Sequence, residues 1–340
     1  MSINFKNIYG NNLLKDLFAE NIEGNKLPHA IIIEGDRGSG RYSFALNVAA
    51  ATLCTDFEKP CGCCKNCRQI FEGVAPDVST VGLSDDKATI SVDAVRFIKN
   101  GAQSVPVEGD LKFYIIRDAD KMTVQAQNAL LKILEEPPSF VVFILISENV
   151  NLLLSTIRSR ACVFRMQRFE DAELAEYVVS VSPNAQSLRK SDETAFNRII
   201  KSSNGCIGRA LGNLDKRSFT KIYDEYTVIK SMIEALCKNS KSDFMRYEDE
   251  LSSKREEFRA FLCTVRGAVR DILALKKGIG NDLVFFECAD EIKHISKTLT
   301  LMSVSSLLNV IEEALNSNEQ NANVNLLKIN FMNAFWKCVH

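Results

Sequence analysis

Short apolar runs alternate with helical patterns along about the first half of the chain. Every residue is apolar in the runs Ala30–Ile33, Phe113–Ile116 and Val141–Ile146, which is typical of strands buried on both faces of a parallel sheet. Between the last two runs, Val124–Glu136 carries apolar residues at helical spacing, with Thr123 as candidate N-cap and a proline pair at its end. These patterns predict an α/β doubly wound domain with helices on both faces of the sheet.

The second half of the chain is predicted to be helical. Residues 168–214 have the pattern of short helices around a loop, Ser180–Ser191, that is rich in Ser, Pro and Asn. Residues 215–340 predict an all-α bundle, because apolar residues recur on two helical faces. The first face consists of Phe258, Phe261, Leu262, Val265 and Val269, and the second of Leu307, Leu308, Ile311 and Leu315. We therefore expect three domains, formed by residues 1–167, 168–214 and 215–340.

Composition and charge exclude some function classes. The chain is 46% hydrophobic and 25% charged, with a formal net charge of −1. No overall basic field would attract nucleic acid, so any DNA contact should be local or shared with partner subunits. The first residues do not resemble a secretory signal, and the longest apolar run, Phe140–Ile146, is too short to span a bilayer. We expect a cytoplasmic protein with mostly reduced cysteines and no membrane contact.

A glycine-rich loop follows the first predicted strand and precedes a helix. Gly35, Gly38 and Gly40 have the placement of a phosphate-binding loop, in which backbone N–H groups surround phosphate oxygens. A working loop continues with Lys, which reaches the outer phosphates, and then Ser or Thr, which holds magnesium. Arg41 and Tyr42 stand at these positions. The loop is therefore predicted to keep its shape without its chemistry; the alternative is a glycine-rich turn unrelated to phosphate binding.

The strand Phe113–Ile116 ends where such a nucleotide site would carry an Asp-Glu pair for magnesium and water. Arg117 falls on the aspartate position and Asp118 on the glutamate position. If the alignment shifts by one residue, Asp118 becomes the metal ligand and Ala119 replaces the base. Both alignments leave the pair incomplete, so ATP hydrolysis is not expected. The alternative interpretation of Asp118 and Asp120 is that they are solvated carboxylates at a strand end.

Five of the eleven cysteines lie close together. Cys54, Cys61, Cys64 and Cys67 have the spacing of a four-thiolate metal site, in which closely spaced C-x-x-C turns direct sulfur atoms at one tetrahedral centre. We expect structural zinc there, since four protein ligands exclude water from the metal. Cys63 is left as a spare thiol. An iron–sulfur cluster is the alternative with less support.

Three segments resemble the clamp-loader AAA+ subunits of bacterial DNA polymerase III. They are the four-cysteine insertion after the loop helix, the segment Asn128–Pro138 and the segment Thr156–Arg160. Gly208–Leu211 is similar to the sensor-2 segment of the same family, more weakly. The last third resembles the family's collar domain only in its length and helicity. The loss of the usual residues at the phosphate loop and at the strand end resembles the delta-prime branch of the family, and the motor branch keeps an intact loop.

The resemblance implies functions for several residues. The family's Ser-Arg-Cys motif carries an arginine finger for a neighbouring subunit's ATP, and it maps onto Ser159 and Arg160, with Ala161 in place of Cys. Arg158 is a weaker candidate, and Arg209 would contact the subunit's own nucleotide in an active relative. Glu135 and Glu136 are expected to be a solvated helix end.

The resemblance also implies partners. These are the gamma/tau motor subunits and the delta subunit in a hetero-pentameric ring, and the sliding clamp and primed DNA through that ring. Bound ATP is expected to be weak or absent. Two alternatives stay open: a catalytically active motor-type ATPase in which Arg41 replaces the lysine, and a DNA-binding protein that uses the four-cysteine zinc knuckle.

Overall fold

The computed structural model describes residues 2–83, 89–214, 216–279, 283–286, 289–319 and 322–340. The chain forms two compact units. Unit 1 comprises residues 1–170 and 205–209, and unit 2 comprises residues 171–204 and 210–340. The division into three domains remains a proposal.

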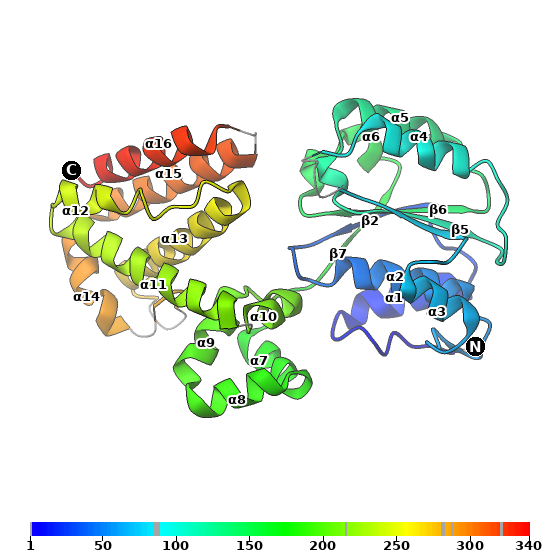
Figure 1. The fold of residues 1–340 in the computed structure, drawn as a ribbon, viewed down its shortest axis with the longest axis horizontal. Helices are drawn as coiled ribbons and strands as arrows, with labels where there is room; N and C mark the ends of the chain where they lie inside the picture. Colours follow the sequence, from blue (N-terminus) through cyan, green and yellow to red (C-terminus); the bar gives the residue numbers. More distant parts are fainter. Residues whose placement is uncertain (1, 84–88, 215, 280–282, 287–288, 320–321) are drawn as a thin grey trace. The chain divides into compact units, whose positions relative to one another are not determined.

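Unit 1 is built on a five-stranded parallel sheet (Figure 1). The strand order is β4-β5-β6-β2-β7. The strands are β2 (Ala30–Glu34), β4 (Val78–Val81), β5 (Lys112–Ile116), β6 (Val141–Ser147) and β7 (Cys162–Arg165). The three apolar runs of the sequence are β2, β5 and β6, and each is buried on both faces as predicted.

Helices cover both faces of this sheet, which confirms the predicted α/β fold class (Figure 1). Alternate residues of β2 contribute to opposite cores: Ile31 and Ile33 pack on one face, and Ala30 and Ile32 on the other. One side carries α1 (Asn12–Glu23), α2 (Arg41–Leu53) and α3 (Lys65–Glu72), and the other carries α4 (Val92–Gly101), α5 (Val124–Glu135) and α6 (Ser155–Arg158). Thr123 caps α5 as predicted, since its side chain accepts a hydrogen bond from the Ala126 N–H.

Shorter elements complete unit 1. Strands β1 (Ser2–Ile3) and β3 (Glu58–Lys59) form a separate two-stranded parallel sheet, which connects the N-terminal segment to the cysteine-rich insertion. Two short 3-10 helices, η1 (Ala119–Lys121) and η2 (Val150–Leu152), follow β5 and β6. They lead the chain away from the carboxyl ends of these strands.

Unit 2 is helical throughout the residues that the structure describes. Its first helices are α7 (Asp171–Val181), α8 (Pro183–Ser191) and α9 (Glu193–Ser202), and α10 (Ile207–Asn213) contains the boundary with unit 1. The predicted loop Ser180–Ser191 is wrong. Most of it is helix α8, which begins with Ser182 as N-cap and Pro183 in its first turn.

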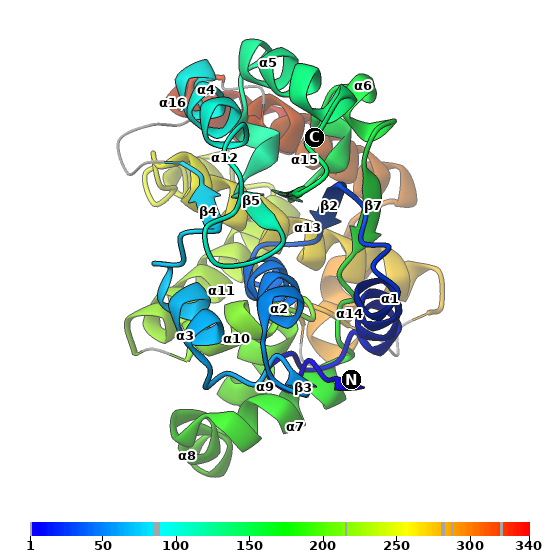
Figure 2. The ribbon, with the colours of Figure 1, turned by 90° about the vertical axis from the view of Figure 1, so that its right-hand side faces the viewer.

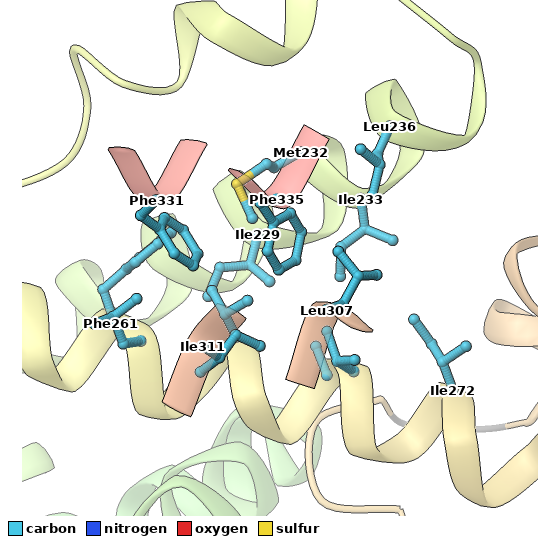
Figure 3. Packing of buried hydrophobic residues seen from close by; sticks show 14 of the residues in the cluster. Ile229, Met232, Ile233, Leu236, Phe261, Ile272, Leu307, Ile311, Phe331 and Phe335 are labelled. Carbon is cyan, nitrogen blue, oxygen red and sulfur yellow. The ribbon is translucent and has the colours of Figure 1, made fainter. Parts of the chain in front are cut away.

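The remaining helices of unit 2 form the predicted bundle (Figure 1; Figure 2 gives the view turned by 90°). They are α11 (Lys216–Cys237), α12 (Lys241–Arg246), α13 (Arg255–Lys276), α14 (Ala289–Thr298), α15 (Leu301–Glu319) and α16 (Val324–Lys337). Both predicted faces lie in its core, with Leu308 partly buried. Figure 3 shows side chains of α11, α13, α15 and α16 meeting there, among them Ile229, Phe261, Leu307 and Phe335.

One buried carboxylate anchors a loop to this bundle. Asp271 is 0% exposed. Its Oδ1 accepts the N–H of Val284 at 2.9 Å, and its Oδ2 accepts those of Phe285 at 2.7 Å and Phe286 at 3.0 Å. Backbone donors that would otherwise be buried without a partner are thereby satisfied.

Asp271→Asn should lower the free energy of unfolding of the bundle by about 2–3 kcal/mol, because a neutral amide offers one acceptor oxygen to three buried donors. Trp336, the single tryptophan of the chain, belongs to the same core, so its fluorescence can follow urea unfolding. Asp249→Asn, at an exposed position, is the control and should change stability by less than about 0.5 kcal/mol. Equal stability of the two variants would contradict the anchoring role.

Candidate functional site

Four cysteine side chains converge between helices α2 and α3. Cys54 directly follows α2, Cys61 follows β3, Cys64 is the N-cap of α3, and Cys67 lies in the first turn of α3. Their Sγ atoms all lie within 4.8 Å of one another. The Cys54–Cys64 and Cys61–Cys67 Sγ distances are 3.9 and 4.0 Å. Metal–sulfur bonds of about 2.3 Å in a tetrahedral site put sulfur atoms about 3.8 Å apart, so this cluster could hold a metal ion with little rearrangement.

Backbone N–H groups surround the sulfur atoms. The Cys64 N–H donates to Cys61 Sγ at 3.2 Å, and this hydrogen bond lowers the pKa of the Cys61 thiol to about 6. Further N–H donors reach Cys54 and Cys64. In contrast, burial raises the pKa of the Cys67 thiol well above its ordinary value. Hydrogen-bond donors stabilise thiolate charge, and a cation at the centre would compensate for the burial of Cys67.

Cys63 does not join the four converging sulfur atoms. It is exposed, and its sulfur lies near Cys61 and the Asp56 carboxylate. The four residues singled out from the sequence spacing are therefore the four that the fold brings together.

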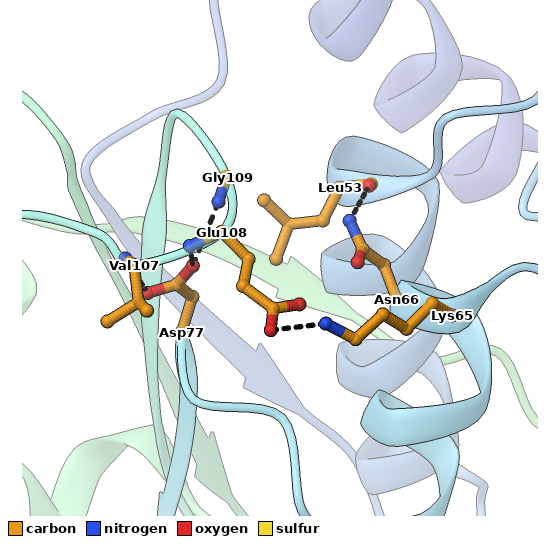
Figure 4. A network of polar contacts seen from close by, with 7 residues as sticks. All are labelled: Leu53, Lys65, Asn66, Asp77, Val107, Glu108 and Gly109. Atoms are coloured by element: carbon orange, nitrogen blue, oxygen red, sulfur yellow. Dashed lines mark hydrogen bonds and ion pairs between the residues drawn. The ribbon is translucent and has the colours of Figure 1, made fainter.

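Polar contacts connect the cysteine-rich segment to the loop at residues 107–109 (Figure 4). Lys65 at the start of α3 forms an ion pair with Glu108 at 2.6 Å, and the Asn66 amide donates to the Leu53 carbonyl at the end of α2 at 2.8 Å. Asp77 holds the loop itself, because its carboxylate accepts three consecutive N–H groups at 2.7–2.9 Å, those of Val107, Glu108 and Gly109. No local pattern in the sequence indicates that Asp77 holds this loop, because the residues are about 30 positions apart.

The glycine-rich loop lies at the opposite end of α2, whose 13 residues span about 20 Å. Gly38 and Gly40 adopt φ values of 86° and 88°, which favour glycine. The Gly38 carbonyl accepts the N–H of Gly208 at 2.8 Å, and a Cβ at Gly38 would lie 2.7 Å from the backbone nitrogen of Arg209. The close approach of this second segment is therefore a further reason for glycine at position 38.

Side chains of the loop make contacts within unit 1. Arg41, the first residue of α2, is 8% exposed, and its Nη2 lies 3.6 Å from the Glu148 carboxylate. Asp36 forms an ion pair with Arg168. Arg41 is therefore drawn toward the end of β6, with Glu148 as its ionic partner.

Tyr42 and Arg117, two further candidate site residues, pack on each other. The Arg117 guanidinium lies over the Tyr42 ring, 4.8 Å from its centroid. Tyr42 Oη is also 3.4 Å from Thr80 Oγ1. Asp118 has a positive φ of 52° at the start of η1, and Asp120 accepts the Glu148 N–H at 3.2 Å. The two residues that the sequence analysis expected at the magnesium positions thus form a cation–π contact with each other.

The candidate finger lies on another part of unit 1. Ser159 ends α6, and Arg160 is the next residue. Arg160 forms an ion pair with Glu135 at 2.9 Å, and its Nη1 donates to the Thr156 carbonyl at 3.1 Å and to Ser159 Oγ at 3.4 Å. Glu135 lies at an exposed helix end, as expected, and α5 and α6 also bring its carboxylate to this arginine. Arg158 instead donates to the Asn151 side chain.

The described helices include none that is long and apolar enough to cross a membrane.

Comparison with known proteins gives consistent matches. A family model described as "DNA polymerase III, delta subunit" matches residues 10–170. The DNA polymerase III subunit delta' of Bacillus subtilis is 28% identical over 317 residues, which cover 91% of each chain. The DNA polymerase III subunit tau of Escherichia coli is 25% identical over 83% of this chain and 46% of its own length. A solved gamma-subunit-related protein of DNA polymerase III from Thermotoga maritima, 19% identical, covers 96% of this chain and 99% of its own, with a TM-score of 0.45.

The relative that is matched over nearly its whole length is thus a delta' subunit, and the matched tau subunit is covered over less than half of its length. The chain resembles the delta-prime subunit of the bacterial DNA polymerase III clamp loader.

Proposed function

We propose that this protein is the delta-prime subunit of a cytoplasmic bacterial clamp loader and has no ATPase activity of its own. In this proposal it assembles with gamma/tau motor subunits and a delta subunit into a pentameric ring that loads the sliding clamp onto primed DNA. The contact between Arg117 and Tyr42 carries the proposal, because it fills the magnesium position with an aromatic ring and a cation.

The geometry of the loop supports weak or absent nucleotide binding. Arg41 is paired with Glu148 inside unit 1, so its charge is already partly neutralised. Arg117 would repel a magnesium ion at the site where a carboxylate would attract it. The two alignments of the strand end place either Arg117 and Asp118 or Asp118 and Ala119 on the Asp-Glu positions. Neither is an Asp-Glu pair.

Arg160 suits the role of a finger supplied in trans. Its side chain is 37% exposed. A guanidinium delivered to a transferring phosphoryl group stabilises the developing charge, which is worth several kcal/mol. Ser159 Oγ, which contacts the same guanidinium, would help to hold it.

Zinc is the proposed occupant of the cysteine cluster. Thiolate ligands select soft or borderline cations, and four sulfur ligands from Cys54, Cys61, Cys64 and Cys67 leave no position open for water. Bound zinc would supply structural cross-linking. The residues around it tie the end of α2 to β3, and hence to the N-terminal strand, and tie α3 to the loop at residues 107–109.

A zinc knuckle that reads DNA has less support. Lys6 and Lys65, two cations near the cluster, form ion pairs with Glu58 at 2.7 Å and Glu108 at 2.6 Å. Their charges are therefore partly compensated before any phosphate arrives.

The isolated chain should show no magnesium-dependent ATP hydrolysis above the buffer rate, because the positions that hold magnesium are occupied by Tyr42 and Arg117. A purified motor subunit measured in parallel provides the positive control. Robust turnover that disappears in Arg41→Ala would instead support the motor-type alternative.

Arg160→Ala should slow hydrolysis at the adjacent motor site by about a thousandfold, the lower end of the effect of arginine fingers. Single-turnover ATP hydrolysis in the reconstituted complex measures this rate, and size-exclusion chromatography checks assembly. Arg96→Ala, at an exposed position of α4, is the control. Unchanged hydrolysis in a fully assembled Arg160→Ala complex would remove the finger assignment.

The native protein should contain about one zinc ion per chain, measured by elemental analysis. Cys64→Ser should lose the metal and Cys63→Ser should retain it, because only the first contributes to the four converging sulfur atoms. Coordination needs thiolates, and the raised pKa of Cys67 means that binding must displace its proton. Zinc affinity should therefore increase as the pH rises from about 6 to about 8. A native protein without metal, or loss of zinc in Cys63→Ser alone, would argue against this site.

A further inference from the structure

A carboxylate from another helix holds the guanidinium of Arg160. Glu135 is the last residue of α5, and its Oε1 lies 2.9 Å from Arg160 Nη2. The other terminal nitrogen, Nη1, contacts the Thr156 carbonyl and Ser159 Oγ on the segment that carries Arg160 itself. The guanidinium is thus restrained from two sides, by its own turn and by α5.

A buried glutamine fixes α5 relative to the start of α6. Gln127 is 3% exposed. Its Oε1 accepts the Leu154 N–H at 2.8 Å, and its Nε2 donates to the carbonyls of Met122 at 3.2 Å and Leu152 at 3.4 Å. Since Leu154 is the N-cap of α6, Glu135 and Arg160 are presented by two elements that are joined through the core.

We propose that Glu135 is a positioning residue that orients Arg160 for the phosphoryl group of the neighbouring subunit. This inference rests on the proposed finger role of Arg160. An arginine side chain on the surface has many rotamers, and catalysis in trans requires one of them at the moment of reaction. Glu135 holds one terminal nitrogen, while the 37% exposure of Arg160 leaves the side chain accessible to phosphate oxygens.

The negative charge of Glu135 has an opposing effect, because it weakens the attraction between Arg160 and a phosphate. Both partners are substantially exposed, with 37% and 49% of their side chains accessible, so water screens this charge. The restraint on the orientation of Arg160 comes from the close contact with Glu135 at 2.9 Å, where little water can screen the two charges from each other. Positioning should therefore outweigh charge neutralisation, and removal of the carboxylate should slow the reaction.

The test uses the reconstituted complex with its sliding clamp and primed DNA. Glu135→Gln should lower the single-turnover rate of ATP hydrolysis about two- to fivefold, the range that one exposed ion pair supports, with KM for ATP unchanged. Glu135→Asp should recover part of the rate. Glu136→Gln removes the same charge from the next, exposed residue and should match the unmodified complex.

A double-mutant cycle separates this role from a general effect on folding. If Glu135 acts through Arg160, the variant with both Glu135→Gln and Arg160→Ala should be no slower than Arg160→Ala alone. An additional loss in the double variant, or an unchanged or faster rate in Glu135→Gln, overturns the positioning role and leaves the finger assignment intact. Full activity of Arg160→Ala overturns both.

Nuclear magnetic resonance of the isolated chain gives a readout that needs no partner. The Arg160 guanidinium should rotate more slowly in the unmodified protein and in Glu136→Gln than in Glu135→Gln. Equal rotation rates in all three would contradict the restraint that this inference requires.

Discussion

Helix α2 constrains both chemical features of unit 1, because it starts in the glycine-rich loop and ends next to the first cysteine. Its inner face is packed without exposure at Phe44, Ala45, Val48 and Ala49. Interiors of this density resist displacement, so α2 cannot shift along its axis without opening cavities against the sheet. The direction in which Arg41 leaves the helix, and the place at which Cys54 meets the other sulfur atoms, are consequences of that packing.

The same packing explains how the glycine-rich loop keeps its shape with Arg41 and Tyr42 at the start of α2. The glycines satisfy a backbone requirement, since Gly38 has a positive φ and meets Gly208 and Arg209 closely. The altered side chains satisfy each other: Arg41 meets Glu148, and Arg117 meets Tyr42. In the proposed function, these two arginines stand where a magnesium–phosphate site would need one cation and one carboxylate. Substitution of a single residue would therefore leave a mismatched partner, and the four residues form two matched pairs instead.

The sequence was sufficient to predict those elements and sites whose signal is local. Periodicity identified β2, β5, β6 and α5, and spacing identified the four cysteines that converge. It failed for α8, whose Ser, Pro and Asn suggested a loop, although Ser182 and Pro183 are also good helix-starting residues. The burial of Ala185 helps to explain why the helix forms there.

The sequence alone could not identify the side-chain pairs around the glycine-rich loop and around Arg160. Tyr42 and Arg117 are far apart in the sequence, and Asp77 is about 30 positions from the loop that it holds. Glu135 and Arg160 are closer in sequence and meet because core packing and Gln127 join α5 to α6. Such contacts depend on tertiary structure, and the residues involved are of types that are usually solvated on helix surfaces.

The position of Arg160 just before a strand of the sheet connects the proposed finger to the glycine-rich loop. β7 begins two residues after Arg160 and pairs in parallel with β2, the strand that leads into the glycine-rich loop. The loop and the proposed finger are thus attached to adjacent strands of one sheet. Loss of ligands at the loop changes side chains at the end of β2 and leaves the pairing of β2 with β7 in place. Loss of the sheet itself would release Arg160 from Glu135, Thr156 and Ser159 together. Under the proposed function, selection for a well-placed Arg160 would therefore maintain this sheet even without nucleotide binding at the loop.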